Sequence, residues 1–386
     1  MHKMKREIHI TINKEVLIWA RESLALSRNQ TSEKTGISFK RIVQLEDEGK
    51  QPTVEELREL SKVYKRTIAT LLLTKPPKEK PLPSDRRTID SQKLDIFHEK
   101  TIMAVRKARA LSISLAELRK EMGVVSTTFN FNALITDSPQ STANKLRHIL
   151  NLDEIREITN LNQAFEAYVE KVESLGISIF QLSLNQDGLR GFSLTDENIP
   201  IIGIKRGNES PTAKTFTLFH ELGHLLLNEG GLCDLSEQSN VGIEKWCNAF
   251  AAEILIPTNE LLHMQIVSEY IDRGEKNWTK SDLVSLGNYF HVGPLAILRS
   301  LLENNLTTVT FYKEKHQAWN KPQFPRSKEP EGRNIPKETI KEKGRIYISL
   351  AFSAFDQNRI DLKDLSDFLG IKLSYIPKTR ELLSTI

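Results

Sequence analysis

The apolar and polar residues of the first 75 positions recur with the spacing of amphipathic helices. The apolar positions are Val16, Leu17, Ala20, Leu24, Ile42, Leu45, Val54, Leu57, Leu60, Val63, Ile68 and Leu71. They predict several short helices between residues 13 and 74. Four prolines then fall between Lys75 and Pro83. Proline cannot occupy a helix interior and stiffens an extended chain, so we expect a connector there.

The remaining chain reads as helices around a small group of strands. Helical spacing returns between about residues 90 and 175, for example in Thr101–Met122, and again from Thr212. Turn-rich sequences separate three short β-type runs, which are Ile177–Leu184, Leu189–Leu194 and Pro200–Arg206. The polar segment Lys313–Glu342, with its scattered prolines, predicts a loop, and Arg345–Leu383 predicts further helix. The expected fold class is therefore mainly α with a small β-sheet, or α+β.

Composition and charge narrow the class of protein. Two cysteines in 386 residues exclude a disulfide scaffold and suit a reducing compartment, so we expect a cytoplasmic location. No apolar run reaches the roughly 18–20 residues that span a bilayer, and the start shows no secretory signal, so we expect no membrane partner. Residues 1–80 carry a net charge of +6 and the rest −2. This asymmetry favours a polyanionic partner for the N-terminal part, although a solvated lysine-rich surface is an equal alternative.

The residues from His220 to His224 carry the clearest chemistry. They form a His-Glu-x-x-His pattern in an apolar helical segment. Residues four apart on a helix share a face, so the two imidazoles can bind one Zn²⁺. Glu221 lies between them and is the candidate to take a proton from an attacking water.

A zinc site of this kind needs a third protein ligand. Glu244 is our candidate, and Asn248, on the same helical face, would hydrogen-bond a ligating histidine. Glu253 lies half a turn away and is interpreted as structural. Asp234 and Glu237 are rival ligands in a polar, turn-like stretch.

The two segments Lys214–His224 and Glu244–Pro257 resemble the ImmA/IrrE family of zinc metallopeptidases. The resemblance implies a gluzincin-like domain with one Zn²⁺ per chain. It also implies a protein substrate, namely a specific helix-turn-helix repressor whose cleavage releases stress-response or mobile-element genes.

Residues Glu15–Leu73 are similar to the XRE-type helix-turn-helix. Ser27 and Ser38 would cap its second and third helices, and Gly36 would form the turn between them. The third helix would enter the major groove of double-stranded DNA. The candidate DNA contacts are Arg28, Phe39, Lys40, Arg41 and Gln44. A fold used only for protein contacts or dimerisation is the alternative, and binding to a palindromic operator would require a homodimer.

Together these signals divide the chain into four parts. We expect a helix-turn-helix domain at residues 1–74, a Pro-rich linker at 75–89, a metallopeptidase domain at 90–305 and a helical C-terminal extension at 306–386. The leading hypothesis is a zinc-dependent site-specific endopeptidase fused to a DNA-binding domain. The alternatives are a transcriptional regulator whose zincin domain is a sensor, and an antitoxin or phage-defence component.

Several smaller features stay open at this point. Cys233 and Cys247 are most simply small buried hydrophobes, with a redox sensor or an extra metal ligand as alternatives. Tyr289 and His291 are weak candidates for stabilising the oxyanion of a tetrahedral intermediate, and we assign no residue to that role.

Overall fold

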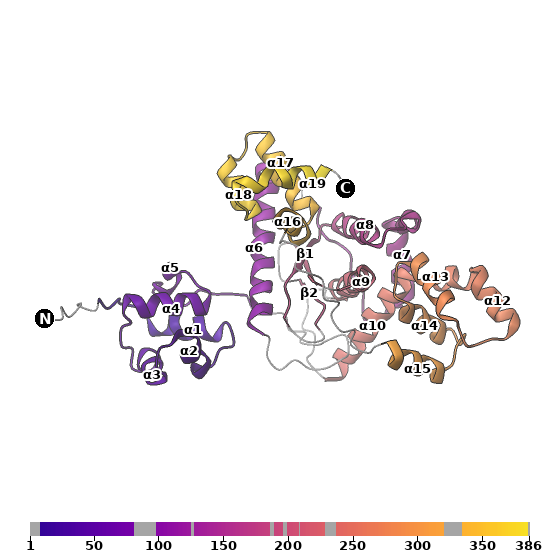
Figure 1. Ribbon diagram of the computed structural model, residues 1–386, viewed down its shortest axis with the longest axis horizontal. Coiled ribbons are helices and arrows are strands. Elements are labelled where there is room, and N and C mark those ends of the chain that lie inside the picture. Colours follow the sequence, from indigo (N-terminus) through magenta and orange to yellow (C-terminus); the bar gives the residue numbers. More distant parts are fainter. Residues whose placement is uncertain are drawn as a thin grey trace. The chain divides into compact units, whose positions relative to one another are not determined.

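The computed structural model describes residues 8–80, 98–124, 127–185, 189–195, 199–207, 209–227, 237–319 and 334–384, with the backbone alone for 237–241 (Figure 1). The chain divides into two compact units. The first unit comprises Met1–Thr88, Gln92–Val105 and Asn185–Asp187, and the second comprises Ile89–Ser91, Arg106–Leu184 and Gly188–Ile386. The four-part division expected from the sequence stays a prediction, and its linker falls largely outside the described residues.

Residues 13–74 of the first unit form the helices that the apolar spacing predicts. They are α1 (Lys14–Glu22), α2 (Arg28–Thr35), α3 (Phe39–Glu46), α4 (Val54–Tyr64) and α5 (Ile68–Leu71). The Ser27 and Ser38 side chains accept hydrogen bonds from the N–H groups of Gln30 and Arg41, so each caps its helix as expected. Gly36 has a φ of 73°, a left-handed conformation that ends α2 and allows the turn into α3.

The second unit combines many helices with one small sheet. Its helices are α7 (Pro139–Ile149), η1 (Leu152–Glu157), α8 (Leu161–Glu173), α9 (Pro211–Leu227), α10 (Glu237–Leu255), α11 (Thr258–His263), α12 (Gln265–Arg273), α13 (Lys280–Phe290), α14 (Pro294–Glu303), α15 (Val309–Trp319), α16 (Ile335–Lys343), α17 (Arg345–Asp356), α18 (Leu362–Leu369), η2 (Leu373–Tyr375) and α19 (Ile376–Ser384). The long helix α6 (Glu99–Glu121) contributes to both units. The expected α+β class with a small sheet is confirmed.

The sheet has the strand order β1-β3-β2. The strands β1 (Ser178–Leu182), β2 (Gly191–Leu194) and β3 (Ile201–Lys205) lie inside the three predicted runs. β3 pairs parallel with β1 and antiparallel with β2. β2 is therefore an edge strand, and it packs against α9.

The largest described hydrophobic core surrounds α9. It joins apolar side chains of α7, α8, α10, α13 and α14 with the α9-facing residues of the sheet, such as Ile179, Ile202 and Ile204. α9 itself buries Leu218, Phe219 and several residues beyond them on nearly all sides. A helix packed from all sides holds its side chains in fixed positions, which suits a functional site.

The prediction of a loop at Lys313–Glu342 is wrong at both ends of this segment, which the structure describes as helical. α15 extends through Trp319, and α16 starts at Ile335. α15 has no fully buried residue, but its Phe311, Tyr312 and Trp319 side chains are partly buried against the core. Pro336 lies in the first turn of α16 behind the Asn334 cap, a position that tolerates proline.

The remaining helices at the end of the chain confirm the predicted helical tail. α16 packs against β1, the edge strand opposite β2, and also against α17 and α19. Among the helices that the structure describes, none combines the length and the apolar character needed to cross a membrane.

Candidate metal centre and nucleic-acid interface

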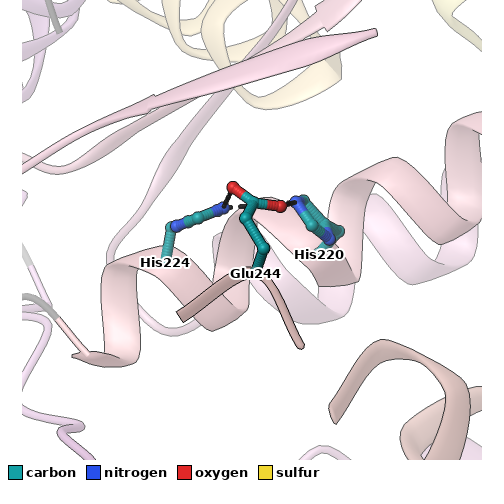
Figure 2. A group of neighbouring side chains, drawn as sticks. All are labelled: His220, His224 and Glu244. Carbon is teal, nitrogen blue, oxygen red and sulfur yellow. Dashed lines mark hydrogen bonds and ion pairs between the residues drawn. The ribbon is translucent and has the colours of Figure 1, made fainter. Parts of the chain in front are cut away.

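α9 carries the His-Glu-x-x-His residues in the middle of its length. Ser210 caps the helix by accepting a hydrogen bond from the Ala213 N–H, and Pro211 is its first residue. His220 and Glu221 are buried, and the His224 side chain is 14% exposed. The two imidazoles point to the same side of α9, as their spacing predicts (Figure 2).

The neighbouring helix α10 brings Glu244 to these histidines, as Figure 2 shows. The two histidine Nε2 atoms lie 3.2 Å apart, and each is 3.4 Å from a different carboxylate oxygen of Glu244. Ligands about 2.0–2.1 Å from a tetrahedral zinc ion are about 3.3–3.4 Å apart, so these side chains fit Zn²⁺. We call His220, His224 and Glu244 the metal cluster.

The ionisation of the cluster also suits a cation. Burial alone would raise the pKa of Glu244, but hydrogen bonds and charge from the two histidines outweigh it and hold that pKa well below its usual value. Burial opposes the charged form of His224, yet Cys247, Glu244 and Glu221 together raise the pKa of His224 well above 6.5. The surroundings of the cluster therefore favour positive charge.

Two further side chains of α10 orient the histidines. Asn248 Oδ1 lies 3.1 Å from Nδ1 of His220, the contact expected from the sequence. The Cys247 side chain lies beside His224 and raises its pKa. Residues 244, 247 and 248 share one helical face, so α10 supplies a candidate ligand and one partner for each histidine.

The contact of Cys247 was missed by the sequence analysis. The thiol is fully buried, as expected for a small hydrophobe, but it also touches a candidate ligand. A Cβ added to Gly223 would lie 3.2–3.3 Å from three atoms of Cys247, so α9 and α10 cross closely at this point. Cys247 follows Glu244 by three residues and so shares its helical face, and this spacing was the signal that could have indicated the contact. Cys233 lies outside the described residues.

Glu221 faces the sheet. Burial raises its pKa, while His224, His220 and a hydrogen bond from the Ser193 hydroxyl act in the opposite direction. Ser193 and Gly191 lie on the face of β2 that packs against α9. A buried carboxylate with a raised pKa and a fixed partner is suited to general-base chemistry.

Alternate residues of β2 turn their backbone N–H and C=O groups toward and away from β3. The Lys205 N–H donates to the Arg190 carbonyl at 2.7 Å, so these residues form a hydrogen-bonded pair. Pairs alternate along an antiparallel ladder, which makes Phe192 and Gly203 the next one. The N–H and C=O groups of Gly191 and Ser193 therefore point away from β3.

Other candidates from the sequence lie elsewhere. Glu253 accepts hydrogen bonds from the N–H and hydroxyl of Thr258 and so caps α11, consistent with a structural interpretation. His291 ends α13, with Nε2 2.8 Å from the Ile158 carbonyl and Nδ1 3.2 Å from the Tyr168 hydroxyl. Tyr289 donates to Glu260. Asp234 and the Glu237 side chain fall outside the described residues.

Two buried arginine side chains support the end of α10, and no pattern in the sequence indicates this role. Arg147 donates to the carbonyl of Ile254 at 2.9 Å, and Arg156 donates to that of Leu255 at 2.6 Å. Cations at a helix C-terminus satisfy its last carbonyls and complement its dipole. They fix the helix that carries Glu244.

The candidate DNA contacts fall into two groups. Phe39 and Lys40 are exposed at the start of α3, and Gln44 is half-buried one turn later. Arg28 instead binds Glu46 at 2.8 Å and also Asp47, while Arg41 binds both carboxylate oxygens of Glu56 at 2.7 and 2.9 Å. These ion pairs occupy both guanidinium groups within the domain.

Comparisons with known proteins agree with this geometry. Residues 172–301 match the model of the IrrE N-terminal-like domain, and residues 17–71 match that of a helix-turn-helix. The first match covers β1–β3 and the metal cluster, and the second covers α2 and α3. No curated protein and no solved structure matches the chain.

Proposed function

We propose that this chain, which joins an IrrE N-terminal-like domain of the metallopeptidase type to a helix-turn-helix domain, is a zinc-dependent, site-specific endopeptidase. The observation that carries the proposal is the metal cluster with Glu221 beside it. In this assignment residues 1–74 bind DNA, 75–89 are the linker, 90–305 form the peptidase domain, and 306–386 have no assigned role. The protein would act in the cytoplasm.

The chemistry follows from the side chains around the cluster. His220, His224 and Glu244 would hold one Zn²⁺, which supplies Lewis acidity to the scissile carbonyl and to an attacking water. Glu221 accepts the proton of that water and then donates it to the leaving amine. Asn248 and Cys247 keep the two imidazoles in place during the reaction.

β2 is the element that we assign to substrate binding. Its outward N–H and C=O groups at Gly191 and Ser193 can pair with an extended segment of the substrate. The side of β2 on which a Cβ at Gly191 and the Ser193 side chain would lie faces Glu221, so a chain added to this edge would run past the base.

We assign a helix-turn-helix repressor as the substrate, on the resemblance to the ImmA/IrrE family. The DNA-binding domain would place the peptidase beside a repressor that is bound to neighbouring DNA. Lys40, Phe39 and Gln44 are the contacts we favour, because Arg28 and Arg41 are held in ion pairs. A palindromic operator would bring two copies together.

The test compares the wild type with Glu221→Gln. Both are expected to bind about one zinc ion per chain, because Glu221 is not in the cluster. Each is incubated with the helix-turn-helix repressors encoded near its gene. Only the wild type should cut one repressor at one bond, since the amide cannot accept the proton. Glu314→Gln, an exposed glutamate on α15, is the matched control and should cut normally.

If both proteins bind zinc and neither cuts any repressor, the peptidase proposal fails in favour of a regulator with a sensing zincin domain. Binding of the same proteins to the upstream operator would then identify the regulator.

A further inference from the structure

The last helices of the chain repeat the connection between α2 and α3. Both α2 and α18 are eight residues long, and each ends at a left-handed glycine, Gly36 with a φ of 73° and Gly370 with a φ of 63°. Three residues lead from each helix into the next, which is α3 in one case and η2, continued by α19, in the other. The third of them is extended in both turns, with φ and ψ of −60° and 146° at Ser38 and of −65° and 150° at Lys372. The two turns therefore have the same length and a similar backbone path.

The hydrogen bonds around the two turns also correspond. Oγ of Ser32 donates to the Ile37 carbonyl at 2.6 Å, and Oγ of Ser366 donates to the Ile371 carbonyl at 2.6 Å. Each serine lies four residues before its glycine. A capping box begins both α2 and α18. The preceding helix α17 packs against α18 and α19, so three helices lie together at the end of the chain (Figure 1).

The exposure of the side chains follows the same order in both places. Leu373, the first residue of η2, is 52% exposed, and Phe39, the first residue of α3, is 49% exposed. Three residues later, Ile376 and Ile42 are both buried. The helical turn after each connection is therefore anchored on its inner side and open to solvent on its outer side.

The connection from α13 to α14 shows that the length of the turn is not sufficient. His291, with a φ of 56°, and the two residues after it join these helices with the same spacing. Residues 294–298 at the start of α14 are all buried or partly buried, and α14 belongs to the core around α9. Of these three connections, only those before α3 and η2 lead to a helix whose first turn is exposed.

We propose that α18, η2 and α19 form a second helix-turn-helix, which binds double-stranded DNA through the exposed first turn of η2. A helix fits the major groove with the side chains of its first turn at the base edges. Lys372 is exposed directly before Leu373, and Lys378 is exposed at the position that Gln44 occupies in α3. Both lysines can pair with phosphates. Lys378 also pairs with Glu381 at 2.6 Å, but both side chains are more than half exposed, and such a pair contributes little.

Acidic side chains limit the direction from which DNA can approach. Asp361 and Asp364 form the capping box of α18, and both are exposed. Carboxylates repel phosphates, so the duplex would lie on η2 and away from the start of α18. Arg380 is not among the contacts, because it pairs with Asp356 at 2.6 Å. The inference goes beyond the proposed peptidase function and does not depend on it.

Photo-crosslinking tests the contact directly. The full-length, zinc-loaded chain carries p-benzoylphenylalanine at position 373 and is irradiated with a fluorescent duplex from upstream of its gene, at low salt. The protein should become joined to the DNA. The same amino acid in place of Lys337, an exposed residue of α16, is the matched control and should give no DNA adduct. A crosslink from position 373 to a protein instead of DNA would overturn the proposal in favour of a protein-docking surface, and so would the absence of any crosslink.

A salt series on the same duplex tests the two lysines. Lys372→Ala combined with Lys378→Ala should lower the slope of log K against log salt concentration by about two, and the affinity by about tenfold per lysine at about 0.1 M salt. Replacing both lysines with arginine keeps the charges and should preserve the slope, and Lys337→Ala should change neither quantity. Both lysines are exposed, so all variants should melt as the wild type does. A wild-type slope in the double alanine variant would remove η2 from the DNA interface.

Discussion

Cys247 shows how a residue can serve a site through a neighbour. Its thiol is buried where α9 and α10 cross closely and lies beside His224, while Asn248 contacts His220. The orientation of both candidate ligands thus depends on residues that do not reach the metal position. Partners of this kind fix the ring and the tautomer of a ligating histidine.

Replacing Cys247 with alanine should therefore weaken zinc binding. We expect a loss of about 10–100-fold in zinc affinity, measured by competition with a chromophoric chelator. Cys247→Ser retains a hydrogen-bonding group and should lose much less, although it disturbs packing to a similar degree. Equal zinc affinities for the alanine and serine variants would mean that Cys247 acts only through packing.

Residue spacing allowed part of this arrangement to be predicted. The shared face of His220 and His224, and that of Glu244 and Asn248, follow from the helical period, because the two residues of each pair lie four apart on one helix. The contacts of Cys247 and Ser193 depend instead on where α10 and β2 cross α9. Crossing points are set by tertiary packing, which a local pattern does not contain.

At the scale of elements, Glu173 connects α8 with several neighbours. This fully buried carboxyl at the end of α8 accepts a hydrogen bond from the Ile179 N–H of β1 and lies near Arg119 of α6. A Cβ on Gly344, between α16 and α17, would lie 3.4 Å from its Oε1. Burial raises the pKa of Glu173 to about 8, with the Ile179 hydrogen bond and the Arg119 charge opposing the rise and the Glu170 charge adding to it.

The raised pKa predicts a stability change with pH. Between pH 4.5 and about 8 the folded protein holds a proton on Glu173 that the unfolded chain releases. The free energy of unfolding should therefore fall as the pH rises, by up to about 1.4 kcal/mol per pH unit from this group. Urea unfolding at pH 5 to 8 should show a flatter profile for Glu173→Gln than for the wild type. Glu314→Gln, an exposed glutamate on α15, should keep the wild-type slope.

α3 provides a second prediction at this scale. Lys40→Ala should weaken DNA binding whatever the base sequence, because we propose that this exposed lysine contacts phosphate. The slope of log K against log salt concentration should fall by about one. Arg41→Ala should instead destabilise the helices, because it leaves Glu56 without its ion pair. Fluorescence anisotropy on operator DNA over a salt series measures the first effect, and an unchanged salt slope for Lys40→Ala would remove that residue from the interface.

The helical misprediction has a related cause. The polar segment with scattered prolines was interpreted as loop, yet Pro336 lies in the first turn of a helix. The part of α15 inside that segment has a single partly buried apolar residue packed on the core, Trp319. Periodicity detects a helix only when one face is buried. The apolar β runs were placed correctly because burial on the sheet produces a signal in the sequence itself.

For the whole molecule, only one of the two compact units contains the candidate zinc ligands. The metal cluster lies entirely in the second unit. A ligand at about 100 times its Kd stabilises its folded site by about 2.7 kcal/mol. Removing zinc with a chelator should therefore lower the melting temperature of the second unit and leave that of the first unchanged. Scanning calorimetry with and without the chelator measures both. His220→Ala should melt at the same temperature with or without chelator, and a chelator effect that persists in this variant would contradict the assignment.

Substrate pairing with β2, as proposed above, would also limit what the protein could cut. An edge strand pairs only with a chain that is itself extended, and a helix has already used its N–H and C=O groups internally. A helical repressor would thus be cleaved in a linker, at a terminus, or where a helix has opened locally. The rate of proteolysis would then follow the local unfolding equilibrium of the substrate, so that destabilising a repressor would shorten its lifetime without any change at the cleaved bond.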